Sequence, residues 1–278
     1  MTIKKKVNGL EVILNQFDFT TKWNGGILLL VLFLINIYLF LLPKGKEDSI
    51  KKTILFISGL VGLFIALGTP VNILGRVTFS FHMIQLVMLL LVVPPLLIVG
   101  FKKGILEKIP SIAPVQKGLY WLTNPFISLF LFYGMFYLYH HPPIFDYVKV
   151  DYYLNYFYLF ALFFAAILLW LPLLSKNALM AKAKQRYCLA NIILIIPLFL
   201  IYLMSKESLY TVYTDIGMLT AALEYCIPDW DTLPKEFFAE LLPFNPLNEQ
   251  KIGGSILISG HAVVFGGVMI KNFRVKEN

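Results

Sequence analysis

Long apolar runs, separated by short polar stretches, dominate the pattern of positions along this chain. A membrane-spanning helix needs about 20 mostly apolar residues, and several runs reach or approach that length. The pattern predicts an all-α polytopic membrane protein with seven transmembrane helices. These helices are expected over residues 22–42, 52–69, 80–100, 123–141, 152–174, 188–205 and 252–271.

The runs divide the chain into four parts. Residues 1–21 are an N-terminal tail, and residues 22–205 hold the first six helices. Residues 206–251 form an acidic extracytoplasmic segment, and residues 252–278 hold the seventh helix and a cytoplasmic tail. No A-x-A-like cleavage site follows the first run, so we interpret it as a retained helix rather than a signal peptide.

The composition agrees with a membrane protein. Hydrophobic residues make up 58% of the chain and charged residues 14%, whereas about 25% is usual for charged residues in soluble domains. A net charge of +8 is also seen in nucleic-acid-binding proteins. Here the lysines gather in short clusters between apolar runs, which is typical of loops on the cytoplasmic side of a membrane. We therefore expect the lipid bilayer, and no nucleic acid, as a partner.

The distribution of Lys and Arg also predicts an orientation. Loops rich in basic residues alternate with loop 70–79, where Arg76 is the one basic residue, and loop 142–151, where Lys149 is. The positive-inside rule places the basic loops in the cytoplasm. With seven helices, the N-terminus then lies outside a bacterial plasma membrane and the C-terminus inside. Lys4-Lys5-Lys6 disagrees with this orientation, but the later segments agree.

The third run begins with polar residues and contains two consecutive prolines. His82 and Gln85 share one helical face near the predicted outer surface. They either hydrogen-bond to neighbouring helices, or His82 joins Met83 and a histidine of the fourth helix in binding a soft metal such as copper. Pro94 and Pro95 are predicted to kink the helix and to free backbone carbonyls near its inner half.

The other histidines lie on the fourth and seventh runs. His140 and His141 precede two prolines, so the fourth helix should end near His141. The candidate metal ligands are therefore His82, Met83, His140 and His141, with Asp146 close by on the same side. His261 is expected near the bilayer middle, where a lone histidine indicates a functional site. Close helix packing through Gly260, Gly266 and Gly267 is the alternative for that region.

The segment 206–251 holds half of the chain's carboxylates. Solvation alone explains this charge, and a docking surface for a basic partner is the alternative. The eight acidic residues are Glu207, Asp215, Glu224, Asp229, Asp231, Glu236, Glu240 and Glu249.

These motifs occur in a family-like order: "LGTPVNILGRVTFSFHMIQLVMLLLVVPPLLIVG", "NPFISLFLFYGMFYLYHHPPIFDYV", "LLWLPLL", "LYTVYTDIGMLTAALEYCIP" and "NEQKIGGSILISG". From about Thr20 to Phe273 the chain resembles the CtaG family of caa-type cytochrome c oxidase assembly factors, in the version found in Gram-positive bacteria. The resemblance implies a seven-helix protein, not an enzyme, that is needed to make an active haem–copper oxidase. Family members often carry histidines where "DYYLNYFYLF" stands here, and this chain has none there.

Two functional hypotheses from different classes follow. The first is a membrane assembly factor that holds or delivers copper at the outer face, with oxidase subunits or a copper donor as partners. The alternative is a haem- or quinone-binding redox protein that uses intramembrane histidines. A transporter would be expected to show internal repeats, and none is visible. No nucleophile elbow, phosphate loop or zinc protease signature is present.

Overall fold

The computed structural model describes residues 10–43 except residue 12, together with residues 49–102, 118, 121, 123–175, 179–227 and 244–274. All regular structure in these ranges is helical, which confirms the all-α class. Five helices there are long and apolar enough to cross a membrane. They are Ile50–Gly68, Phe79–Gly100, Tyr152–Leu174, Ala181–Met204 and Pro246–Lys271. Two of the predicted spans appear as shorter apolar helices, Gly25–Leu41 and Pro125–Tyr139.

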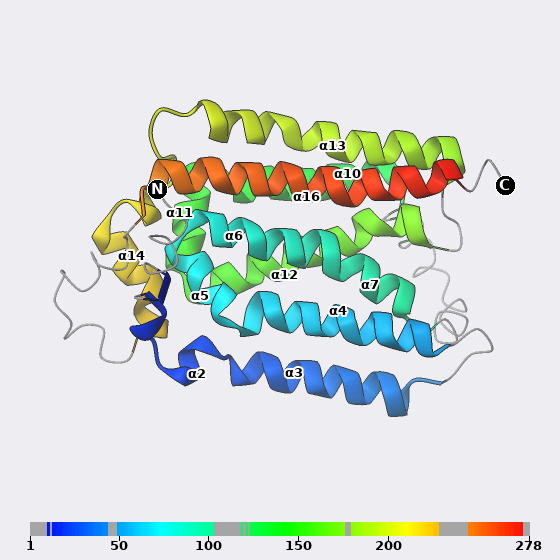
Figure 1. Ribbon diagram of the computed structural model, residues 1–278, viewed down its shortest axis with the longest axis horizontal. Helices are drawn as coiled ribbons and strands as arrows, with labels where there is room; N and C mark the ends of the chain where they lie inside the picture. The colour runs from blue at the N-terminus through cyan, green and yellow to red at the C-terminus, as the bar shows by residue number, and fades with distance from the viewer. Residues whose placement is uncertain are drawn as a thin grey trace.

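The long helices lie along the long axis of the molecule, and short helices gather at one end (Figure 1). The long elements are α3 (Gly25–Asn36) with the π-helical η1 (Ile37–Leu41), α4 (Ile50–Gly68), α6 (Phe79–Leu86) with η2 (Val87–Val92) and α7 (Val93–Gly100), α10 (Pro125–Tyr139), α12 (Tyr152–Leu174), α13 (Ala181–Met204) and α16 (Pro246–Arg274). The short ones are α2 (Phe19–Lys22), α5 (Pro70–Val77), α11 (Pro142–Val150), η4 (Thr211–Tyr213), α14 (Ile216–Leu223) and η5 (Glu224–Cys226). We call the end that carries α5, α11 and α14 the α14 end.

The core is built from pairwise packing of these helices. Helix α16 packs against α13 and α6, α4 packs against α7 and α3, and α12 packs against α10 and α7. One apolar cluster runs through the bundle, and a second lies at the α14 end. The second cluster joins Ile13 and Phe17 to Ile73 of α5 and to Leu219 and Leu223 of α14. Burial of these side chains fixes α14 on α5.

The exterior of the bundle is apolar in a way that suits lipid. Large hydrophobic side chains are widely exposed on α3 and η1 (Phe33, Phe40), α10 (Phe126, Phe130) and α16 (Val263). Soluble proteins rarely expose apolar surface so extensively. In a bilayer the same surface contacts hydrocarbon at no cost.

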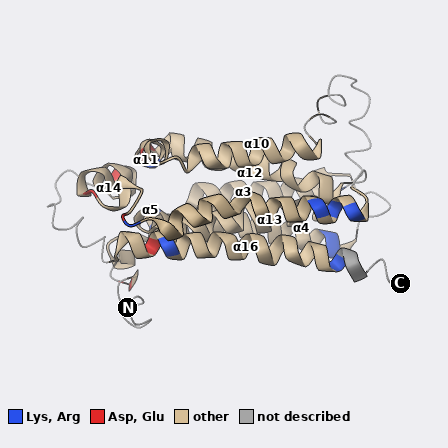
Figure 2. Ribbon diagram, turned by 90° about the horizontal axis from the view of Figure 1, so that it is seen from above, with Lys and Arg blue, Asp and Glu red and all other residues tan. Residues whose placement is uncertain are grey.

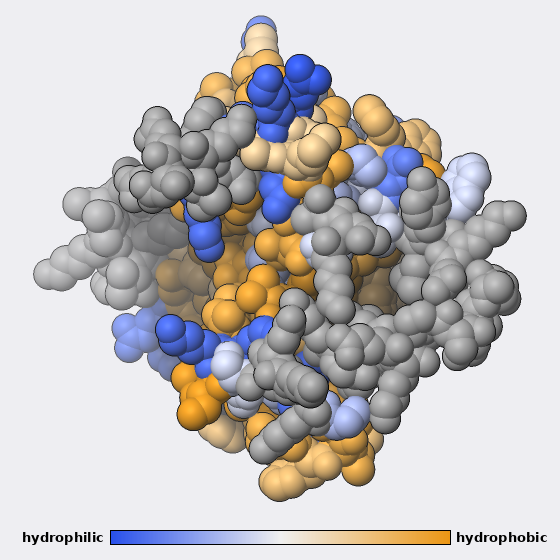
Figure 3. Space-filling model, turned by 90° about the vertical axis from the view of Figure 1, so that its right-hand side faces the viewer, coloured by the Kyte–Doolittle hydropathy of each residue, from blue (hydrophilic) through white to orange (hydrophobic). Residues whose placement is uncertain are grey.

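Charged residues are distributed unequally between the two ends. Figure 2 shows Lys and Arg gathered at the end opposite α14. They include Lys51 and Lys52 at the start of α4, and Lys182, Lys184 and Arg186 at the start of α13. We call this the basic end. Viewed directly, it has hydrophilic side chains around its rim and hydrophobic ones toward its hollowed centre (Figure 3).

The two prolines of the third run have the predicted effect on the backbone. Instead of one kinked helix, the run forms α6, the π-helical η2 and then α7, which opens with Val93-Pro94-Pro95. Proline has no N–H, so the carbonyl of Leu90, four residues before Pro94, loses its usual helical donor. The indole Nε1 of Trp170 in α12 donates to that oxygen at 3.2 Å. The prediction of a freed carbonyl is confirmed, and a neighbouring helix satisfies it.

Two boundaries of the seventh run and the acidic segment were wrong. Helix α16 begins at Pro246, not near residue 252. The side chain of Asn245 accepts from the Asn248 N–H and Pro246 occupies the first turn, a strong helix start that an apolar-run count ignores. Glu249 and Gln250 therefore lie on the first turns of α16 and are buried.

The segment 206–251 is also more ordered than a turn-rich cap, because η4, α14 and η5 lie within it. Asp215 accepts from the Met218 N–H and caps α14, so its carboxylate has a structural role. Four of the predicted acidic residues lie outside the described residues, namely Asp229, Asp231, Glu236 and Glu240.

Candidate functional site

Three basic side chains are buried at the α14 end. Arg76 of α5 is 2% exposed, His82 of α6 is 0% exposed and Lys149 of α11 is 1% exposed. Buried basic groups are rare because the loss of hydration is costly. We call Arg76, His82 and Lys149 the buried basic cluster.

A close approach of α5 to α6 brings the cluster together. A Cβ atom on Gly75 would lie 3.3 Å from the Gln85 Oε1 atom and 3.3 Å from the His82 Cα atom, so a side chain there would push the helices apart. The bare backbone leaves the Gly75 carbonyl open to two donors. The Nζ of Lys149 and the hydroxyl of Tyr213 each donate to it at 3.1 Å.

The imidazole of His82 has a neighbour at each nitrogen. Its Nδ1 lies 3.1 Å from the Lys149 Nζ, and its Nε2 lies 3.3 Å from the hydroxyl of Tyr139 in α10. With the lysine as donor, the ring proton sits on Nε2, where the tyrosine oxygen accepts it. The His82 ring thus links α6 to α10 and α11.

Lys149 has few ways to compensate its charge. Burial lowers the pKa of the Lys149 amine well below its ordinary value, and the positive charge of Arg76 lowers it further. Asp146, the acidic residue on the same helix, uses its carboxylate elsewhere. It accepts from the backbone N–H groups of Thr211 at 2.9 Å and Val212 at 3.1 Å.

These two hydrogen bonds give Asp146 a clear local role. They hold η4 against α11, and η4 carries the Tyr213 hydroxyl to the Gly75 carbonyl. Burial raises the pKa of the Tyr213 phenol well above its ordinary value. The phenol therefore stays a neutral hydrogen-bond donor at every physiological pH.

The predicted metal ligands are only partly brought together. The His82 and His140 rings lie 6.2 Å apart between centroids. Met83 lies on another side of α6, against α16, since a Cβ on Gly253 would meet its Cγ at 3.0 Å. His141 is exposed at the start of α11.

This donor set does not fit a resident copper ion. Both nitrogens of His82 have polar neighbours, and the Nδ1 of His140 lies 2.7 Å from the Phe136 carbonyl. In the part of the chain that the structure describes, no three His, Cys, Asp or Glu side chains lie close enough to hold a metal ion. The Nε2 of His140 is buried without a hydrogen-bond partner, and it is the one ring nitrogen of this pair that remains open.

Gln85 has the bridging contacts expected of a polar link between helices. Its amide donates to the carbonyl of Ala66 in α4 at 2.8 Å and to the side chain of Asn72 in α5 at 2.9 Å. Both contacts are interhelical. Gln85 therefore fixes α4, α5 and α6 relative to one another.

His261 lies in a different environment. It is 1% exposed, and its Nδ1 lies 2.9 Å from the Leu257 carbonyl one turn earlier in α16. The predicted packing through glycine holds at Gly260, where a Cβ would meet Val87 at 2.9 Å. It was wrong for Gly266 and Gly267, which have nothing within 4 Å of such an atom.

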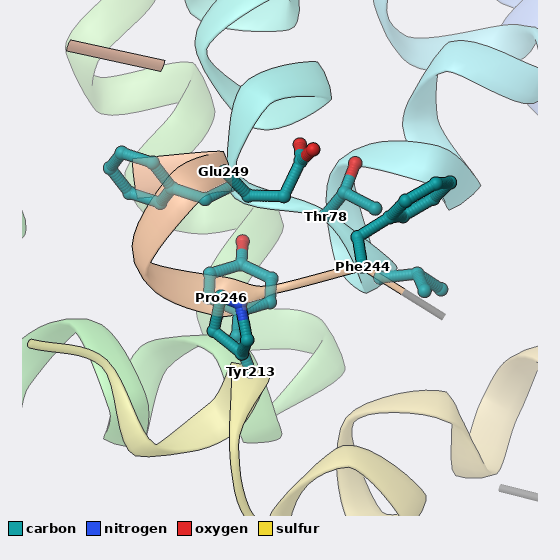
Figure 4. A pocket seen from close by; sticks show the side chains of 7 residues that line it. Thr78, Tyr213, Phe244, Pro246 and Glu249 are labelled. Atoms are coloured by element: carbon teal, nitrogen blue, oxygen red, sulfur yellow. The ribbon is translucent and has the colours of Figure 1, made fainter. Parts of the chain in front are cut away.

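The first turns of α16 complete the α14 end. The Ser80 hydroxyl of α6 donates to the Glu249 carboxylate, and the side-chain oxygen of Gln250 accepts from the Leu209 N–H at 2.8 Å. A pocket of about 250 Å³, including its part open to solvent, lies beside this contact. Figure 4 shows its lining residues, which are Val77, Thr78, Phe79, Tyr213, Phe244, Pro246 and Glu249.

The sequence reasoning missed Arg76, Lys149, Tyr139 and Tyr213. A usable signal existed for two of them. Arg76 and Lys149 are the lone basic residues of loops 70–79 and 142–151, which otherwise lack basic residues. A single basic residue on the side that the positive-inside rule leaves neutral deserves a specific explanation, and here that explanation is burial.

Long apolar helices with buried polar groups at one end define this protein as a helical membrane protein. Comparison with protein-family models then specifies the class further. The model of the cytochrome c oxidase caa3 assembly factors, CtaG, matches residues 29–275, and the chain belongs to this family. The resemblance seen in the sequence motifs is confirmed. No curated protein and no solved structure matches the chain.

Proposed function

We propose that this protein is a non-catalytic assembly factor for a haem–copper cytochrome c oxidase in the bacterial plasma membrane, and that it acts through its α14 end. Family membership supports the oxidase assembly role. The buried basic cluster is the observation that locates it. Buried polar groups of a membrane protein cost stability and typically mark functional sites, and Arg76, His82 and Lys149 all lie at this end.

We further propose that seven helices cross the membrane. The five long apolar helices are joined by α3 with η1 and by α10, which lie alongside them (Figure 1). Helix α10 has 15 residues and is about 22 Å long at 1.5 Å per residue. It is short for a hydrocarbon core of about 30 Å, and local thinning of the bilayer would accommodate it.

The charge distribution supports an orientation with the basic end in the cytoplasm. Under the positive-inside rule, the α14 end then lies outside, the chain starts outside, and α16 ends inside. Labelling of single cysteines with a membrane-impermeant maleimide tests this in intact cells. In a Cys188→Ser, Cys226→Ser background, Tyr225→Cys should be labelled and Met180→Cys should not. These residues are 61% and 85% exposed, and the reverse labelling pattern would refute the orientation.

The assembly role is tested by oxidase activity in a strain that lacks the gene. The deletion should lose caa-type oxidase activity, and the wild-type gene should restore it. His82→Ala should fail to restore activity while its protein remains in the membrane, whereas His261→Ala should restore more. His82 belongs to the buried basic cluster, and His261 packs beside Gly260. An unchanged oxidase in the deletion strain would remove the proposed function.

Copper and haem remain separate predictions. His82, Met83, His140 and His141 would have to rearrange to hold copper together, so no mechanistic step is assigned to the metal. Metal analysis after loading with reduced copper tests copper binding. A Soret band in the purified protein would favour the redox alternative.

The acidic residues between 206 and 251 remain a proposed docking surface for a basic region of an oxidase subunit or copper donor. Neutralising Asp229, Asp231, Glu236 and Glu240 together should slow oxidase maturation at low salt, because such charges mainly raise association rates. The effect should shrink at high salt. A quadruple variant with the wild-type oxidase yield at low salt would show that these charges only solvate the segment.

A further inference from the structure

We propose that Arg76 anchors a buried carboxylate-binding site at the α14 end. The Nη1 of Arg76 donates to the Ala222 carbonyl of α14 at 3.0 Å. The other two nitrogens, Nε and Nη2, are buried and have no hydrogen-bond partner. These two atoms form one edge of the planar guanidinium. Their N–H groups point the same way, and this fork matches the two oxygens of a carboxylate.

Leaving this edge unsatisfied is unusual for a folded protein. Most buried polar atoms have a partner, and the exceptions require an explanation such as a missing ligand. The side chain is also held in place. Its guanidinium carbon lies 5.1 Å from the ring centroid of Tyr152 and 6.0 Å from that of Tyr156. The orphaned edge is therefore preorganised rather than mobile.

The local charge also favours an anion. Lys149 and His82 lie in the same buried cluster, and Lys149 is close enough for Arg76 to affect its protonation. Among the described residues, no carboxylate oxygen contacts Arg76 or Lys149. The Asp146 oxygens accept from backbone N–H groups instead. A bound anion would supply the missing negative charge.

The surroundings select a carboxylate over a phosphate. Two free N–H groups in one plane satisfy a planar group that carries one negative charge. A phosphate has a further charge and further oxygens, which here would face aromatic rings and the backbone of α14. Tyr152 and Tyr156 are only partly buried, while the guanidinium behind them is 2% exposed. The route from water to the site therefore runs past these two rings.

Purified protein in detergent provides the test, independently of the oxidase role. Its thermal unfolding is measured against increasing sodium acetate, N-acetyl-aspartyl amide, sodium phosphate and sodium chloride at matched ionic strength. Acetate or the aspartyl amide should raise the unfolding temperature in a saturable way, and chloride and phosphate should not. Preference for acetate indicates a small-molecule carboxylate, and preference for the aspartyl amide indicates one carried by a protein chain.

Variants then assign the effect to the fork. Arg76→Lys keeps the charge but loses the paired N–H groups, and it should weaken binding by a factor of about 10–100, the range expected for hydrogen bonds to a charged group. Lys206→Gln changes an exposed lysine and should bind like the wild type. Should Arg76→Lys fail to fold, the wild-type titrations still decide. Equal responses to acetate and chloride, or a stronger response to phosphate, would overturn the proposal.

Discussion

Replacing Lys149 by methionine separates the fold from the function of the buried basic cluster. The substitution removes a buried amine and keeps an unbranched side chain of similar length. It deletes the donor to the Gly75 carbonyl and the neighbour of the His82 Nδ1. The carbonyl keeps the Tyr213 hydroxyl at 3.1 Å, so only the imidazole nitrogen is left without its partner.

Two opposing effects set the change in stability. Each lost hydrogen bond costs about 0.5–1.5 kcal/mol. Exchanging a buried charged group for an apolar one of similar volume is often neutral or stabilising by about 1–4 kcal/mol. The free energy of unfolding should therefore change by no more than about 2 kcal/mol. Oxidase maturation should nevertheless be lost if the cluster is the functional site.

The pH dependence provides a sharper measurement. The pKa of Lys149 is lowered in the folded state by burial and by Arg76, while the unfolded chain has a lysine pKa of about 10.4. Between these two pKa values the unfolded chain binds a proton that the folded protein does not. The free energy of unfolding therefore rises with pH, by at most about 1.4 kcal/mol per pH unit, and levels off above the unfolded pKa. Below the folded pKa this contribution is absent.

Denaturant unfolding of purified protein at several pH values from 7 to 10 tests the reasoning. The wild type should gain stability relative to Lys149→Met as pH rises. Lys206→Met, a change at an exposed lysine, should follow the wild type. Parallel pH curves for wild type and Lys149→Met would refute the lowered pKa. Normal oxidase activity in a strain with Lys149→Met would refute the functional role of this lysine.

Three further predictions concern the fold. Trp170→Phe should lower the free energy of unfolding by about 1–3 kcal/mol, because the Leu90 carbonyl loses its donor; thermal unfolding in detergent measures this. Gly253→Val should destabilise the protein by about 1–3 kcal/mol, since its Cβ would lie 2.6 Å from the Phe79 ring, whereas Gly266→Ala should leave the unfolding temperature unchanged or slightly higher. Asp146→Ala should speed amide hydrogen exchange in η4, whose N–H groups it holds, and exchange at the wild-type rate would contradict that role.

Much of the helical architecture could be predicted from apolar run length alone. The end of α10 at Tyr139 followed from the two prolines after His141, and the open carbonyl of Leu90 followed from Pro94. The start of α16 did not follow, because the side chain of Asn245 and the ring of Pro246 determine it. Such local hydrogen bonds are invisible to a hydropathy count.

The candidate site was harder to predict for a physical reason. His82 attracted notice as a polar residue in an apolar run. Lys149 and Arg76 were interpreted as loop charges, since a lysine or arginine between two spans is usually solvated. Their burial depends on how α5, α11 and α14 fold back over the bundle end. That arrangement is tertiary and leaves no periodic trace in the sequence.

The shared acceptor of the cluster is a backbone atom, and this has an evolutionary consequence. Lys149 and Tyr213 both donate to the carbonyl of Gly75, and every amino acid at that position would carry the same oxygen. Mutation can therefore alter the donors or block their approach with a side chain, but it cannot delete the acceptor. Variation among relatives should thus be tolerated in pairs at positions 149 and 213, around a hub that the genetic code is unable to remove.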